Sequence, residues 1–160
     1  MKKITIELKW GIIFVIAALL WMLFEKAMGW HDVHISKHAI YTNFFGIIAV
    51  LIYYLALRDK KYNFYNGIMT WRQGFVAGLI ITIVVTLVSP LSQFITSTYI
   101  TPDYFSNVIA YSVETKTMTQ EQAEAYFNLK SYIIQATFGA LVMGVVTAAA
   151  VAWILKSKKE

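Results

Sequence analysis

The chain has 160 residues, of which 58% are apolar and only 14% are charged, and its formal net charge is +5. This composition argues against a disordered chain, which has low hydrophobicity, and against a soluble domain, in which about 25% of residues are charged. Too few charges are present to follow a phosphate backbone, so we expect no nucleic-acid partner. The absence of cysteine excludes disulfides, thiolate metal sites and cysteine nucleophiles. A small multi-pass membrane protein, with the lipid bilayer as its main partner, is therefore predicted.

Four apolar stretches are long enough to cross a bilayer, which takes about 20 helical residues. They cover approximately residues 10–30, 39–57, 74–99 and 132–155. No internal repeat or low-complexity segment divides the chain, so residues 1–160 are expected to form a single membrane domain. The expected fold class is all-α, an integral membrane bundle of four transmembrane helices.

The basic residues predict the orientation of this bundle, because short cytoplasmic loops carry an excess of lysine and arginine. With the N-terminus in the cytoplasm, ten basic residues lie inside and four lie outside. The ten inside are Lys2, Lys3, Lys9, Arg58, Lys60, Lys61, Arg72, Lys156, Lys158 and Lys159, and the four outside are Lys26, Lys37, Lys116 and Lys130. Both termini are therefore predicted to be cytoplasmic.

Residues 58–73 form the connector between the second and third stretches, and Asn66-Gly67 within it is a turn signal. We interpret it as an ordinary basic cytoplasmic loop. The alternative is a contact with anionic lipid headgroups. That contact would use the cations Arg58, Lys60, Lys61 and Arg72.

Residues 100–131 form the largest segment outside the predicted spans and are expected to be extracytoplasmic. Helical spacing relates Tyr104, Phe105, Val108, Ile109 and Ser112. This pattern predicts a short amphipathic helix on the outer membrane surface. Thr119 and Gln122 have the spacing of a capping box. We expect the helix that begins there to continue without a break into the fourth span.

Small residues recur at every fourth position of the last two spans, and positions four apart share one helix face. The third span carries Gly74, Gly78, Thr82 and Thr86, and the fourth carries Ala136, Ala140, Gly144, Ala148 and Ala152. Helices in a bilayer associate by close packing at such faces. We therefore expect these two faces to pack against each other, with dimerisation through one of them as the alternative.

Pro90 lies toward the outer end of the third span and is expected to kink this helix, because proline removes one backbone hydrogen bond. Ser89, Ser92 and Gln93 are close enough in sequence to bond the freed carbonyl groups. A broken helix can also mark a transporter binding site. Such breaks normally come in pairs, and only one is present, so a simple kink is favoured.

Glu25 is the ionisable residue nearest to the apolar part of a span, and it lies near the outer edge of the hydrocarbon. Lys26 follows it directly. We expect a helix end whose two charged side chains reach toward water. The alternative is a carboxylate in an outward-facing vestibule, where it would bind a cation or a proton.

All three histidines fall in one outer segment, which reads His31-Asp32-Val33-His34-Ile35-Ser36-Lys37-His38. If this segment is helical, His34 and His38 share a face and are candidate zinc or copper ligands, with Asp32 or Glu25 adding an oxygen. We nevertheless favour a polar interfacial loop without metal, and we expect no cofactor. No arrangement typical of nucleophilic or acid–base catalysis is present in the sequence.

Several local features carry a resemblance to a known family. They are the basic start Met1-Lys2-Lys3, the segment Gly74-Phe75-Val76-Ala77-Gly78, the segment Tyr99-Ile100-Thr101-Pro102-Asp103-Tyr104 and the segment Thr119-Gln120-Glu121-Gln122-Ala123. With them, the whole chain resembles the DUF4199 family of small bacterial membrane proteins of unknown function, found largely in Bacteroidota. The resemblance implies a four-span protein of the bacterial inner membrane. It implies no activity, cofactor or site residue.

Three functions are compatible with this sequence. We favour a non-enzymatic protein of the bacterial inner membrane, an accessory or assembly component that recognises lipids, other membrane proteins or a second copy of itself. The alternative is a small oligomeric transporter or channel that uses Glu25 and the polar kink at Pro90. The third is a membrane metalloenzyme with its metal at His34 and His38.

Overall fold

Four helical stretches in the computed structural model are long and apolar enough to span a membrane, namely Thr5–Ala27, Ile35–Asn63, Trp71–Ile100 and Leu129–Leu155. The structure describes residues 4–157, and it contains no strand in this range. The predicted all-α class with four membrane-spanning helices is therefore confirmed. Lys2, Lys3, Lys158 and Lys159, which support the predicted orientation, lie outside the described residues, as does Met1.

The elements follow in a simple order along the chain. They are α1 (Thr5–Ala27), α2 (Ile35–Tyr41), the 3₁₀ turn η1 (Thr42–Phe44), α3 (Phe45–Asn63), α4 (Trp71–Ile95), the π-helical turn η2 (Thr96–Ile100), α5 (Tyr104–Glu114), α6 (Gln120–Tyr126) and α7 (Leu129–Leu155). The second span thus consists of α2, η1 and α3, and the third consists of α4 and η2.

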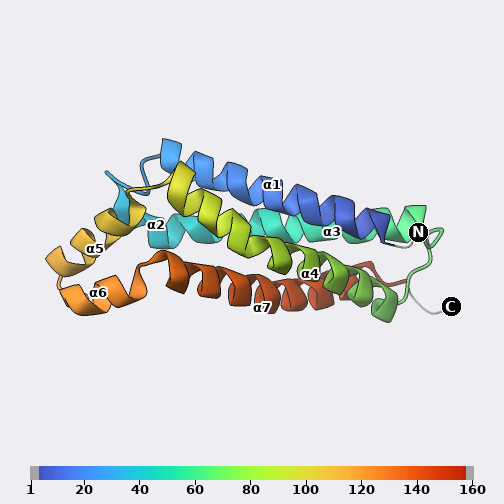
Figure 1. Ribbon diagram of the computed structural model, residues 1–160. Coiled ribbons are helices and arrows are strands. Elements are labelled where there is room, and N and C mark those ends of the chain that lie inside the picture. Colours follow the sequence, from blue (N-terminus) through green and yellow to red (C-terminus); the bar gives the residue numbers. More distant parts are fainter. Residues whose placement is uncertain (1–3, 158–160) are drawn as a thin grey trace.

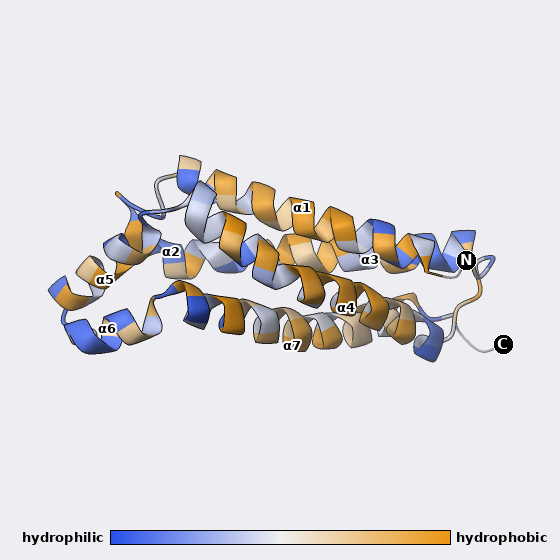
Figure 2. Cartoon of the chain, in the orientation of Figure 1, coloured by the Kyte–Doolittle hydropathy of each residue, from blue (hydrophilic) through white to orange (hydrophobic). Residues whose placement is uncertain are grey.

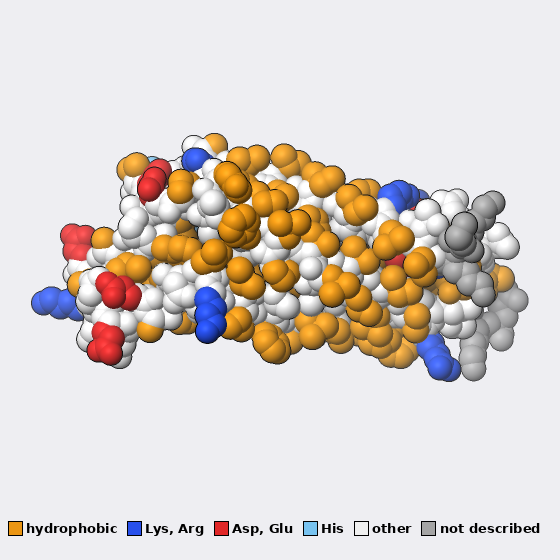
Figure 3. Space-filling model, viewed as in Figure 1, with side chains coloured by type: hydrophobic (Ala, Val, Ile, Leu, Met, Phe, Trp, Pro, Cys, Tyr) orange, Lys and Arg blue, Asp and Glu red, His pale blue; other side chains and the backbone are white. Residues whose placement is uncertain are grey.

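The four spans lie side by side, with the chain termini at one end of the bundle and α5 and α6 at the other (Figure 1). We call these the terminal end and the α5–α6 end. Apolar residues dominate the long helices and polar residues gather at the two ends (Figure 2). Large apolar side chains cover much of the face seen in Figure 3, while the charged side chains lie toward its ends. Such a wide exposed apolar surface is typical of a protein in contact with lipid.

α4 and α7 pack closely through small residues. A Cβ atom added at Gly78 would lie 2.5 Å from Cβ of Ala148, and one added at Gly144 would lie 2.5 Å from Cγ2 of Thr82. Such distances leave no space for a side chain, so the two backbones approach as closely as glycine allows. The buried hydroxyl group of Tyr53, on α3, lies 2.8 Å from Oγ1 of Thr82 and ties the second span to this contact.

Pro90 lies inside α4, which continues to Ile95. Its ring nitrogen cannot bond the carbonyl of Thr86, one helical turn earlier. The hydroxyl of Ser89 lies 3.0 Å from this carbonyl oxygen and donates to it. The side chain of Ser89 therefore replaces the backbone hydrogen bond that proline removes.

The helix that begins at Gln120 does not continue into the fourth span, contrary to our expectation. The capping box of Thr119 and Gln122 forms, but α6 ends at Tyr126 and α7 begins at Leu129. The side chain of Asn128 accepts a hydrogen bond from the backbone N–H of Ser131 at 2.9 Å. Asn128 is thus the N-cap of α7 and satisfies a free N–H of its first turn. Its side-chain amide also donates to the carbonyls of Glu124 and Ala125 in the last turn of α6.

Candidate metal centre

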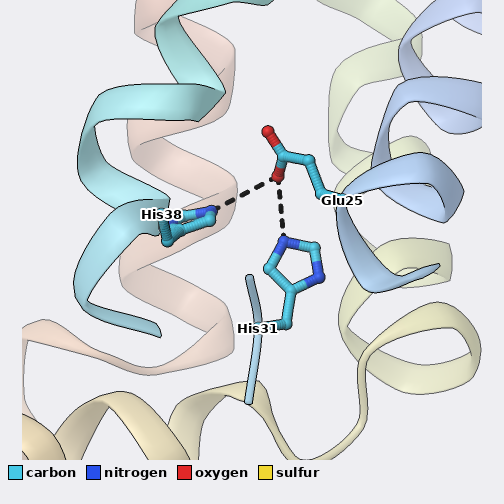
Figure 4. A group of neighbouring side chains, drawn as sticks. All are labelled: Glu25, His31 and His38. Carbon is cyan, nitrogen blue, oxygen red and sulfur yellow. Dashed lines mark hydrogen bonds and ion pairs between the residues drawn. The ribbon is translucent and has the colours of Figure 1, made fainter. Parts of the chain in front are cut away.

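A carboxylate and two imidazoles meet inside the α5–α6 end. Glu25 comes from the last turn of α1, His31 from the connection after it, and His38 from α2 (Figure 4). Their side chains point toward one another, and a ligand atom from each lies within 4.8 Å of the other two. The sequence spacing alone does not produce this cluster, because the chain reverses direction between α1 and α2.

The reversal depends on the connection of residues 28–34. Gly29 has a φ of +70°, a left-handed conformation that glycine adopts without steric cost. Its carbonyl accepts the backbone N–H of His34 at 2.7 Å, which closes the turn. Trp30 is buried and stacks on Tyr41 of α2 with ring centroids 4.5 Å apart. This stacking holds the connection against α2 and helps to direct His31 inward.

The three ligand atoms are close and poorly accessible. Oε2 of Glu25 lies 2.9 Å from Nε2 of His31 and 3.4 Å from Nε2 of His38. The side chain of Glu25 is fully buried, whereas those of His31 and His38 are 7% and 19% exposed. A buried carboxylate is costly unless positive charge or hydrogen bonds compensate it. Of the three side chains, that of His38 is the most exposed, so the cluster is most accessible from its side.

A second layer of side chains orients the cluster. The indole N–H of Trp21 donates to Oε1 of Glu25 at 2.6 Å, and the hydroxyl of Tyr104 lies 3.2 Å from Nδ1 of His38. The side-chain amide of Asn107, on α5, donates to the backbone carbonyl of His31 at 3.1 Å. Burial, followed by the neighbouring Tyr132, raises the pKa of Tyr104. The Tyr104 hydroxyl therefore remains protonated and neutral over the physiological range.

The ligand set suits a divalent transition-metal ion. Zinc binds imidazole nitrogen and carboxylate oxygen at about 2.0–2.2 Å, so adjacent ligands around a tetrahedral ion are about 3.3 Å apart. The two distances from Oε2 of Glu25, 2.9 and 3.4 Å, lie on either side of this value. The atoms are thus spaced to surround an ion after small side-chain movements. With three protein ligands, a fourth position would remain for water or another ligand.

The structure corrects two expectations for this region. Glu25 does not reach toward water, because α2 and the preceding connection fold over it and supply hydrogen-bond donors. His34 is exposed and has non-helical backbone angles at the start of α2, so it does not join His38 in a site. Asp32 is also exposed, and its carboxylate accepts the backbone N–H of Val33. His31 takes the place that we had assigned to His34.

The sequence analysis also missed a second buried group of charges, at the terminal end. Lys60 of α3 lies 2.8 Å from Oε1 of Glu7 of α1, and both side chains are almost fully buried. The sequence analysis places Lys60 in a cytoplasmic connector, but α3 extends to Asn63 and directs this side chain inward. Its carboxylate partner is 53 positions away, so only the packing of α1 against α3 reveals the pair.

The chain matches the family described as "Protein of unknown function (DUF4199)" over residues 9–157 and therefore belongs to it. No curated protein and no solved structure matches the chain. The family match agrees with the resemblance seen in the sequence, and it assigns no role to Glu25, His31 or His38.

Proposed function

We propose that this DUF4199 protein is a non-enzymatic accessory protein of the bacterial cytoplasmic membrane that binds a divalent transition-metal ion of the zinc type. The ligands are Glu25, His31 and His38. The observation that carries the proposal is the convergence of Oε2 of Glu25 with Nε2 of both histidines inside the bundle. Two nitrogens and one carboxylate oxygen form a ligand set that zinc and neighbouring divalent ions accept.

The surroundings of the cluster support a metal site over a structural ion pair. Histidines that bind metals normally hydrogen-bond through their other ring nitrogen, which sets the ring orientation. Tyr104 occupies this position at Nδ1 of His38, and Trp21 holds Oε1 of Glu25 so that Oε2 faces the histidines. Both contacts use atoms other than the converging ones, which pair with one another in the structure. Nδ1 of His31 is buried and has no such partner among the described residues.

The burial of the ligands supports a role in holding the ion and not in exposing it to a substrate. Glu25 is fully buried, and the most exposed ligand side chain, that of His38, is 19% exposed. A bound divalent ion would join α1, α2 and the connection between them. In this proposal the ion stabilises the arrangement that the α5–α6 end presents to its partners.

We further propose that the α5–α6 end, and with it the metal centre, faces away from the cytoplasm. Of the ten basic residues within residues 4–157, six lie at the terminal end, namely Lys9, Arg58, Lys60, Lys61, Arg72 and Lys156. The positive-inside rule then favours a cytoplasmic terminal end. The ion would be taken from the extracytoplasmic side, through the partly exposed edge at His38.

The test is equilibrium binding of Zn²⁺ to detergent-solubilised protein purified without a histidine tag. We expect one ion per chain for the native protein. Glu25→Gln, His31→Ala and His38→Ala should each weaken binding by at least about ten-fold, because each removes one ligand of three. His34→Ala is the matched control, since it removes an exposed histidine from the same segment.

Two results would overturn the proposal. The first is a native protein that binds no Zn²⁺ while remaining folded by circular dichroism. The second is an affinity that falls equally in His34→Ala and in His31→Ala, which would indicate surface binding by the histidine-rich segment.

A further inference from the structure

A pocket at the terminal end, far from the metal centre, combines an ion pair with an apolar wall. It has a volume of about 290 Å³ and lies between the start of α1, the end of α3 and the start of α4. It is lined by Ile4, Glu7, Lys60, Phe64, Tyr65, Val76, Ala77 and Ile80. The pocket is therefore polar where Glu7 and Lys60 meet and apolar along α4.

The ion pair leaves one carboxylate oxygen without a donor. Oε1 of Glu7 lies 2.8 Å from Nζ of Lys60, whereas Oε2 is buried and has no hydrogen-bond partner among the described residues. A buried acceptor without a donor loses its interaction with water and gains nothing in return. The Glu7 carboxylate is thus prepared to accept one further hydrogen bond from a group in the pocket that it lines.

The position of Glu7 narrows the class of donor. Glu7 lies in the first turn of α1 and Lys60 in the last turn of α3, at the end of two spans where lipid headgroups are expected. The exposed side chain of Val76 leads from the pocket to the lipid-facing surface of α4. A ligand that reaches this pocket from the bilayer has an apolar tail and a polar head at headgroup depth.

We propose that this pocket binds an ethanolamine phospholipid, whose ammonium group donates to Oε2 of Glu7 and whose phosphate faces Lys60. The zwitterionic headgroup complements the ion pair, because its ammonium group is opposite in charge to Glu7 and its phosphate is opposite in charge to Lys60. The acyl chain lies along Val76 and Ile80. Burial and the nearby negative charge of Glu7 raise the pKa of Tyr65, so its hydroxyl remains neutral at the edge of the pocket.

The N–H donor distinguishes this lipid from choline phospholipids, which carry the same charges but have no N–H. The test measures lipid retention by native mass spectrometry of protein in vesicle-derived nanodiscs. The probes are phosphatidylethanolamine, its mono- and dimethylated forms, and phosphatidylcholine with the same acyl chains. We expect affinity to fall with methylation, and phosphatidylethanolamine to bind about ten-fold more tightly than phosphatidylcholine, as a charge-assisted hydrogen bond predicts.

Two variants test whether the preference for phosphatidylethanolamine over phosphatidylcholine depends on Glu7. Glu7→Met should abolish the preference for phosphatidylethanolamine, because methionine has a similar length but presents no oxygen to accept the ammonium N–H. Asp59→Asn is the control: it removes a carboxylate at the same end, outside the pocket, where Asp59 pairs with Lys9. It should retain the preference.

Equal affinity of the native protein for phosphatidylethanolamine and phosphatidylcholine would overturn the proposal, and this comparison needs no variant to fold. A preference that survives in Glu7→Met would also overturn it. The metal proposal is unaffected by either result, since the two sites share no residue.

Discussion

The hydroxyl of Tyr104, on α5, lies 3.2 Å from Nδ1 of His38, on α2, although the two residues are 66 positions apart. This contact turns the opposite ring nitrogen, Nε2, toward Glu25. The ring of Tyr104 also packs edge-on against His31, with centroids 5.3 Å apart. One residue of the segment between the third and fourth spans thus orients both histidines of the candidate metal centre.

Replacement of Tyr104 by phenylalanine should weaken Zn²⁺ binding by about ten- to a hundred-fold, since partners of ligand histidines contribute this much. The ring remains, so packing against His31 is retained. The measurement is a competition titration with a zinc chelator of known affinity. Tyr132→Phe is the control, because its hydroxyl contacts that of Tyr104 and no ligand. Equal affinities of Tyr104→Phe and the native protein would show that the contact does not support the metal.

The close contact of α4 with α7 should be sensitive to any added side chain at Gly78. Gly78→Val places atoms within 2.5 Å of Ala148 and should destabilise the bundle by about 1–3 kcal/mol, as overpacking does in tight cores. Thermal unfolding in detergent is the measurement. Gly139→Val on α7 is the control, since a Cβ there meets nothing within 4 Å. If both variants unfold at the same temperature, the contact does not determine stability.

Much of the fold is predictable from the sequence because long apolar runs directly reflect the thickness of a bilayer. The number of spans agrees with the structure, although Thr5–Ala27 begins earlier than its apolar run, and Ile35–Asn63 both begins earlier and ends later than its own. The additional turns carry charged residues, such as Glu7 and Lys60, whose burial depends on a partner in another helix. The sequence analysis missed the break before α7. Asn128 lies near other polar residues, and nothing in the sequence distinguishes it as a helix cap.

The sequence analysis identifies only part of the candidate metal centre, without His31 and without its geometry. Glu25 and His38 were both considered as ligands, yet helical spacing paired His38 with His34. That spacing does not apply, because residues 28–34 form a turn and α2 begins only at Ile35. The turn that contains the positive φ of Gly29 places His31, and not His34, beside Glu25. A single glycine in a polar loop gives no signal of this kind in one sequence.

The proposed orientation predicts the accessibility of two engineered cysteines in a chain that has none of its own. Thr117→Cys, in the exposed turn between α5 and α6, should react with an impermeant maleimide added to intact cells. Ile68→Cys, exposed in the connector at the terminal end, should react only after the membrane is opened. The reverse pattern would place the termini outside.

The most direct measurement of the central claim is X-ray absorption at the zinc edge of the Zn²⁺-loaded protein. We predict two imidazole nitrogens and additional oxygen ligands at about 2.0–2.2 Å. The spectrum of His31→Ala should lose one imidazole, whereas that of His34→Ala should be unchanged. A native spectrum without imidazole, or one that His31→Ala leaves unaltered, would contradict the assignment of Glu25, His31 and His38 as the metal centre.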